Sequence, residues 1–214
     1  MESTVIIFSI KDIYKRFNIM PSLQMHMMRV AAVAELILST QADNYPENHK
    51  NNVIAALLLH DLGNIVKFKL EKEPYWKKIQ QETIVKYGSV DHEATENMIY
   101  ELGVNERIAF LISEMGFENL QHVIDSNDME LKICLYADQR VAPYGVSSLH
   151  ERFADLRKRY KNTALENRYE PSQEEKSLRL EQQIFKSSSL HPLDINDQTI
   201  TRYMKAHNTC MPTD

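Results

Sequence analysis

The chain has 214 residues, of which 43% are hydrophobic, and it contains only 5 glycines and 7 prolines. This length suits one domain, and long runs rich in Leu, Glu, Lys, Gln and Ala favour an all-α protein. The 25 Lys and Arg against 30 Asp and Glu give a formal net charge of −5, which argues against broad nucleic-acid binding.

The cysteines and the N-terminus indicate the compartment. Cys134 and Cys210 are too few for a disulfide framework, which favours a reducing environment. The apolar segment VIIFSI, residues 5–10, is followed at once by Lys11 and is too short for a secretion signal or a membrane span. We therefore expect a cytoplasmic protein with no membrane contact.

In the first half of the chain, apolar residues recur with the spacing of α-helices. Helices are predicted over 9–17 and 21–40. The apolar segment NNVIAALLLHD, 51–61, predicts a third helix, with Gly63 in the position of its C-terminal cap. A loop and a surface helix are predicted over 65–89.

Residues that favour helix ends mark the next elements. A helix is predicted over 91–102, with Gly103 ending it. Another helix is predicted from Asn105 to Gly116. Asp128 is an N-cap residue that opens the segment MELKICLYADQRVA, which predicts a helix up to the following proline.

The C-terminal part continues the helical pattern. Ser148 and Glu151 have the spacing of a capping box and open a helix. Two amphipathic helices are predicted near 171–187 and 196–206. No stretch alternates apolar and polar residues cleanly enough to predict a strand.

Four residues with metal-ligand chemistry lie within or at the end of apolar helical stretches: His26, the adjacent pair His60 and Asp61, and Asp138. Imidazole nitrogen and carboxylate oxygen are donors that divalent transition metals accept. Burying an unpaired aspartate beside a histidine is costly, so the pair after ALLL needs a compensating partner. A helical bundle could bring the four residues together around a bound cation, and this cation would be the compensating partner.

The segments HMMRVAAVAELI, NNVIAALLLHDLGN and YADQRV carry these residues and resemble the HD-domain superfamily of metal-dependent phosphohydrolases. That family has a histidine, then a His-Asp doublet ending a helix, then a distant aspartate. The resemblance covers about residues 20–145. It implies an HD-domain-like helical bundle in which His26, His60, Asp61 and Asp138 bind metal.

The resemblance also implies the cofactor, a divalent transition metal (Mn, Co, Ni, Fe or Zn) bound as one ion or two. Some members of the family bind a second metal through further histidines, and His92 lies at a comparable distance after the doublet. We therefore expect His92 among the metal ligands, the alternative being a first-turn histidine that faces water. Glu114 and His122 are weaker candidates for a second metal.

Basic residues near the four ligands are candidates for phosphate binding. Arg29 lies three residues after His26, close to the same helix face, and we expect it to act in catalysis with Asp61. Lys67 and Arg140 follow the doublet and Asp138, and we expect them to bind substrate. The alternative for each of these cations is an ion pair with a neighbour or plain solvation.

Three functions are consistent with the sequence. The first is hydrolysis of a phosphate ester, with a nucleotide or a related small phosphomonoester as substrate. The second is a di-iron HD-fold oxygenase, which would require His92 and His122 together. The third is a helical module that binds a nucleotide or a protein without turning it over.

The domain organisation predicted is a metal-binding helical domain over 1–160 and a C-terminal helical extension over 161–214, packed on the same domain. The expected partner is a small phosphorylated substrate. Apolar faces on the two C-terminal helices would also suit a homodimer.

Overall fold

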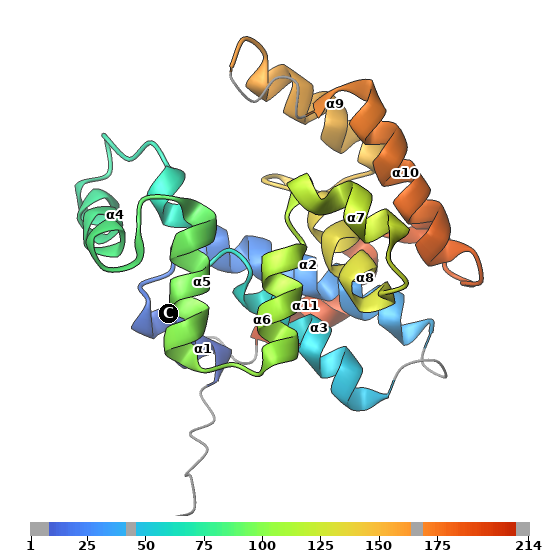
Figure 1. The fold of residues 1–214 in the computed structure, drawn as a ribbon, viewed down its shortest axis with the longest axis horizontal. Helices are drawn as coiled ribbons and strands as arrows, with labels where there is room; N and C mark the ends of the chain where they lie inside the picture. The colour runs from blue at the N-terminus through green and yellow to red at the C-terminus, as the bar shows by residue number, and fades with distance from the viewer. Residues whose placement is uncertain (1–8, 42–45, 164–168, 209–214) are drawn as a thin grey trace, which may run out of the picture.

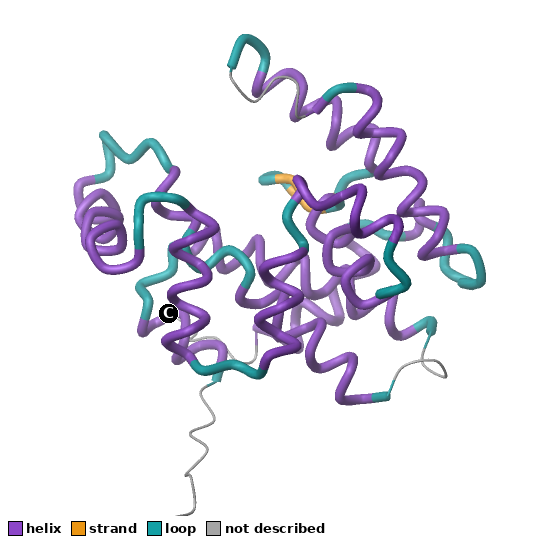
Figure 2. Tube along the Cα trace, viewed as in Figure 1, coloured by secondary structure: helices purple, strands orange, loops and turns teal. Residues whose placement is uncertain are grey.

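The computed structural model describes residues 9–41, 46–163 and 169–208, so the first eight residues and Cys210 lie outside the described part. The predicted all-α class is confirmed (Figures 1 and 2). No described helix has both the length and the apolar character needed to cross a membrane.

The described residues form eleven α-helices, three short 3-10 helices and one two-stranded hairpin. The α-helices are α1 (Ile10–Arg16), α2 (Pro21–Ser39), α3 (Glu47–Leu59), α4 (Pro74–Tyr87), α5 (Asp91–Leu102), α6 (Glu106–Glu114), α7 (Leu120–Asp125), α8 (Met129–Gln139), α9 (Leu149–Tyr160), α10 (Pro171–Phe185) and α11 (Asp197–Asn208). The others are the 3-10 helices η2 (Asn64–Lys67), η3 (Phe117–Asn119) and η5 (Pro192–Asp194), and the antiparallel strands β1 (Val141–Ala142) and β2 (Gly145–Val146).

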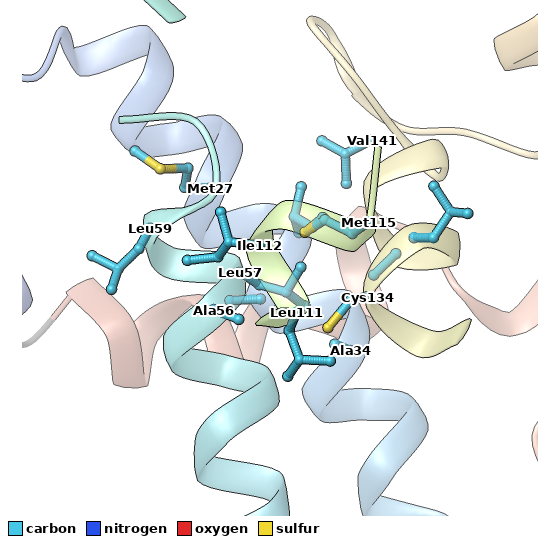
Figure 3. Packing of buried hydrophobic residues seen from close by; sticks show 14 of the residues in the cluster. Met27, Ala34, Ala56, Leu57, Leu59, Leu111, Ile112, Met115, Cys134 and Val141 are labelled. Carbon is cyan, nitrogen blue, oxygen red and sulfur yellow. The ribbon is translucent and has the colours of Figure 1, made fainter. Parts of the chain in front are cut away.

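The core is built around α2, which contacts α3, α8 and α11. Small residues on α2 let these helices approach closely, and Ala34 is fully buried there together with Cys134 of α8. Figure 3 shows Leu57 of α3 beside Leu111 of α6 in the same cluster. Cys134 is therefore a small core residue.

Several helices begin where the sequence predicts. Asn105 accepts a hydrogen bond from the Ile108 amide at 2.9 Å, and Asp128 accepts one from the Leu131 amide at 3.1 Å. Ser148 and its partner three residues later form the expected capping box. These caps depend only on residues within one turn, which explains why they can be predicted.

The role predicted for Gly63 as the C-terminal cap of this helix is wrong, because the C-cap residue is His60. Helix α3 ends at Leu59, and Gly63 has an ordinary φ of −83°. A Cβ at Gly63 would lie 2.5 Å from the Thr95 amide nitrogen, so the glycine is required by close packing on α5. Its own amide donates to Thr95 Oγ1 at 3.0 Å, which holds the turn after the His-Asp doublet against the start of α5.

Two elements were not predicted. Helix α7 is only six residues long, too short for a clear periodic pattern. The helix after Asp128 ends at Gln139, and the chain turns back through the hairpin around Pro143. The helical conformation is unfavourable for the residue that precedes a proline, so the helix cannot continue through Ala142. The hairpin is closed by a hydrogen bond from the Ser147 amide to the Arg140 carbonyl at 2.8 Å.

The C-terminal helices share the core of the rest of the chain. Helix α11 lies along α2, and α10 contacts α7, α8 and α9. Leu180 and Ile184 of α10 and Ile200 and Tyr203 of α11 are buried in the main cluster. The apolar faces considered for a homodimer are therefore covered within one chain, and the homodimer stays a prediction.

Candidate metal centre

The structure brings the four predicted ligands to one place, although they come from three different helices and a turn. His26 Nε2 lies 3.1 Å from Asp138 Oδ1 and 3.5 Å from Asp61 Oδ2. His60 Nε2 lies 3.5 Å from Asp138 Oδ1 and 3.6 Å from Asp61 Oδ1. Two imidazoles therefore face two carboxylates across a space of a few ångströms.

Each of these side chains is positioned by the end or the face of a helix. His26 lies on α2, Asp138 in the last turn of α8, and His60 is the C-cap residue of α3. His60 Nδ1 lies 2.8 Å from the Leu57 carbonyl oxygen. A neutral imidazole that donates from Nδ1 keeps the lone pair on Nε2, the atom that faces the carboxylates.

The donor set fits a divalent cation. The His60 side chain is 5% exposed, and its Nε2 is buried without a hydrogen-bond partner. His26, His60 and Asp138 each offer one ligand atom within 4.8 Å of the others. Two nitrogens and carboxylate oxygen suit Mn, Fe, Co, Ni or Zn, and a bound ion would satisfy the buried nitrogen.

The electrostatics of the cluster are dominated by the two carboxylates. Burial disfavours a charged His60, but Asp61 and Asp138 outweigh it and raise the pKa of His60 to about 9. Partial burial would raise the pKa of Asp138, yet the hydrogen bond with His26 and the nearby His60 imidazole hold it well below its ordinary value. A positive charge at this point is strongly favoured, whether it is a proton or a metal ion.

The cluster lies in the wall of a cavity of about 790 Å³. This volume suits a small organic molecule. Other residues that line the cavity come from α9 and α10 and from α5, α6 and η3. Four cationic side chains line the cavity, namely Lys67, Arg152, Arg159 and Lys176.

Two further predicted residues line this cavity but lie outside the ligand group. Lys67 Nζ is 2.7 Å from Asp91 Oδ2; partial burial disfavours its charge, but Asp61 and Asp91 outweigh burial and raise the pKa of Lys67. His92 Nε2 is 3.2 Å from Glu96 Oε1, and its side chain is 46% exposed. Within the described residues, His92 does not belong to the group of converging ligand atoms.

Arg29 is not among the described residues that line the cavity, so the structure gives no support to the catalytic role predicted for it. Arg29 Nε lies 3.6 Å from Asp197 Oδ1 of α11. Three residues along a helix rotate the side chain by about 60° away from His26, which is enough to turn it to the flank covered by α11.

Arg140 is also placed away from the cavity, which corrects its predicted role in substrate binding. Its guanidinium is buried and donates to the Tyr136 hydroxyl and to the Ser147, Pro192 and Ile195 carbonyls. It lies two residues after Asp138, about 200° around the helix, and so faces the opposite side. Its contacts join α8 to the hairpin and to the segment before α11.

The weaker candidates for a second metal do not assemble at the cluster. Glu114 accepts a hydrogen bond from Asn119 Nδ2 at 3.4 Å, and His122 is exposed on α7. Neither residue is among the described residues that line the cavity.

The cavity also has a wall that the sequence analysis missed. Gln139, Arg152, Arg159 and Lys176 line it together with the aromatic residues Phe117, Phe153, Tyr160 and Tyr169. The spacing of Arg152 and Arg159 by seven residues was an available signal, because it places both on one face of α9. That this face meets the metal cluster depends on the tertiary fold.

Comparison with known proteins gives no match: no family model, no curated protein and no solved structure matches this chain. Its function must therefore be inferred from the site.

Proposed function

We propose that the protein is a metal-dependent phosphohydrolase that acts on a phosphate ester, most simply a nucleotide or a related small phosphomonoester. The observation that carries the proposal is the meeting of His26, His60, Asp61 and Asp138 around the unpartnered His60 Nε2, in the wall of a cavity lined by cations.

His26, His60 and Asp138, with Asp61 beside them, would hold the ion, which we take to be Mn, Co, Ni, Fe or Zn. A bound ion of this kind lowers the pKa of a water ligand and polarises a phosphoryl oxygen. One ion fits the converging atoms, and a second ion through His92 stays a prediction.

The chain's own residues supply the remaining chemistry. Lys67, fixed by its contact with Asp91 2.7 Å away, presents a cation at the cavity wall and would offset charge on the phosphoryl oxygens. Asp61 contacts both imidazoles and lines the cavity, so its carboxylate can orient a water and accept its proton. The walls from α9 and α10 would shield the phosphate from bulk water.

The oxygenase alternative is not proposed, because it requires His92 and His122 in one site, and His122 is exposed on α7 and is not among the described residues that line the cavity.

The test combines metal analysis with a substrate screen. Protein purified without chelators should contain at least about half an equivalent of transition metal. It should also release phosphate from some nucleotides or sugar phosphates when metal is added. Asp61→Ala should lose both properties, whereas Asp125→Ala, an exposed carboxylate on α7, should keep both. The proposal would be contradicted if protein purified without chelators contained no transition metal and released no phosphate from any compound in the panel, whichever metal was added.

A further inference from the structure

Outside the metal cluster, two cavity-lining residues in the described part of the chain hold buried polar atoms without hydrogen-bond partners. They are Gln139, whose amide nitrogen and oxygen both lack partners, and Arg152, whose Nε and Nη1 lack them. Leaving such atoms unpaired is costly, and nearly all buried polar groups in proteins are paired. Two exceptions in one cavity therefore indicate groups that a ligand completes.

Arg152 carries most of this signal. Its side chain is 16% exposed, and the nearest carboxylate oxygen, Asp155 Oδ2, lies 3.6 Å from Nη1, beyond a good hydrogen bond. The same carboxylate oxygen is already bound by Arg159. The charge of Arg152 is thus only partly compensated within the chain, in a place where an unpaired cation is expensive.

A second cation stands on the neighbouring helix. Lys176 of α10 lines the same cavity and, among the described residues, forms no hydrogen bond or ion pair. Figure 1 shows α9 and α10 running side by side at the edge of the molecule, and these helices carry none of the metal-ligand candidates. The cavity therefore has a metal-ligand wall and a separate cationic wall.

We infer that Arg152 and Lys176 form a second anion subsite, so that the substrate carries another anionic group besides the phosphate that is hydrolysed. The planar guanidinium suits a phosphate or a carboxylate through paired hydrogen bonds, and the ammonium adds a point charge. This inference rests on the proposed function, because it takes the metal cluster as the place of hydrolysis.

Gln139 extends this subsite towards the metal cluster. It follows Asp138 directly on α8 and lines the cavity with an amide that can both donate and accept. A hydroxyl group between the two anionic ends of the substrate would pair with it. The substrate class is therefore a small polar molecule with anions at both ends, such as an organic bisphosphate or a phosphorylated carboxylic acid.

The test uses phosphonates, which cannot be hydrolysed, so it does not depend on turnover. Alkane bisphosphonates with three, five and seven carbons are titrated into the metal-loaded protein by calorimetry and compared with alkyl monophosphonates of equal length. Carboxyalkyl phosphonates form the third arm. At one chain length the second anion should tighten binding by about tenfold to a hundredfold. If the carboxylate arm matches the bisphosphonate, the second anion is a carboxylate; if it binds more weakly, the second anion is a phosphate.

The variants assign the effect to this wall. Arg152→Met and Lys176→Met should each remove about tenfold of the preference for the second anion and leave monophosphonate binding unchanged. Arg152→Lys keeps the positive charge but loses the paired hydrogen bonds of the guanidinium, so it should lose an intermediate part of the preference for the second anion. This variant replaces Arg152→Met if Arg152→Met does not fold. Lys158→Met on α9 and Arg179→Met on α10, both exposed and outside the cavity lining, should change nothing.

The inference is overturned if no chain length favours the second anion. It is also overturned if the preference for the second anion is as large as in the wild type in both Arg152→Lys and Lys176→Met. The proposed function fails by a separate result, the absence of both metal and phosphate release. A protein that hydrolyses monophosphates without preferring a second anion would contradict only the subsite.

Discussion

At the scale of single residues, the site depends on how one imidazole is oriented. The Leu57 carbonyl lies 2.8 Å from His60 Nδ1, and the opposite nitrogen is buried facing two carboxylates. His60 directly follows the last residue of α3, so its imidazole can contact this carbonyl through Nδ1 while Nε2 faces the carboxylates of Asp61 and Asp138. This orientation explains why a His-Asp doublet is found at the end of an apolar helix.

Gly63 keeps the turn after the doublet in place, and its replacement should show this. In Gly63→Ala the new Cβ would meet backbone atoms of α5, the nearest at 2.5 Å, and we expect a loss of at least about 2 kcal/mol of unfolding free energy. Gly103→Ala is the matched control. Gly103 has a φ of 64°, and a Cβ added there would have no atom within 4 Å. Only about 1 kcal/mol of backbone strain is therefore expected. Urea denaturation measures both; equal losses would mean that α5 yields to the added methyl group.

Substitutions of Lys67, near the His-Asp doublet, and of Arg29, near His26, should have different effects. Lys67→Ala should lower kcat/KM for the substrate found in the screen by about tenfold or more, without loss of metal. Arg29→Ala should leave kcat/KM unchanged and cost less than about 1 kcal/mol, because its pair with Asp197 is partly exposed. Steady-state kinetics with metal analysis decides; a large kinetic defect in Arg29→Ala would restore the role that the sequence suggested.

At the scale of elements, Glu101 of α5 joins three helices. It contacts Lys86 and Tyr87 at the end of α4 and Arg16 of α1, at 2.7 to 2.8 Å. Hydrogen bonds from Lys86, Tyr87 and Arg16 lower the pKa of Glu101 to about 2. Since the folded-state pKa lies below the ordinary value, this carboxylate contributes stability above about pH 4.5 and loses it as the pH falls towards 2.

Glu101→Gln should therefore flatten the acid side of the stability profile. At pH 7 the variant should lose at most about 1 kcal/mol, since the ion pairs are partly exposed to solvent. The difference from the wild type should shrink between pH 4.5 and pH 2. Thermal melting across this range tests it, and a difference that stays constant with pH would show that the carboxylate charge is not involved.

The elements also show what could be predicted from the sequence. Helix starts at Asn105, Asp128 and Ser148 depend on groups within one turn, and the metal-ligand candidates were marked by their types and helical context. Arg140 was misplaced because its acceptors at Pro192 and Ile195 lie more than fifty residues away. No local pattern carries such contacts.

The cationic wall was missed for the same reason. Arg152 becomes a cavity residue only because α9 and α10 pair and face the ends of α3 and α8. From the sequence alone, an arginine in a helix rich in charges resembles any solvated residue.

At the scale of the whole molecule, the ligands come from segments that lie far apart in the sequence, and the fold must assemble them. The buried residues of α2, α3, α6 and α8 do this independently of any ion, so the protein should stay folded at room temperature when metal is removed. A metal that binds only the assembled site nevertheless adds stability by mass action.

The most direct test of the central claim is the melting temperature of chelator-treated protein during titration with Mn²⁺ or Co²⁺. At a hundredfold excess over the dissociation constant, the added stability is about 2.7 kcal/mol, which raises the melting temperature by about 5 to 10 °C for a chain of this size. Asp138→Asn should melt near the metal-free value and respond little. The account predicts this contrast, and a wild-type melting curve that does not move with either metal would contradict it.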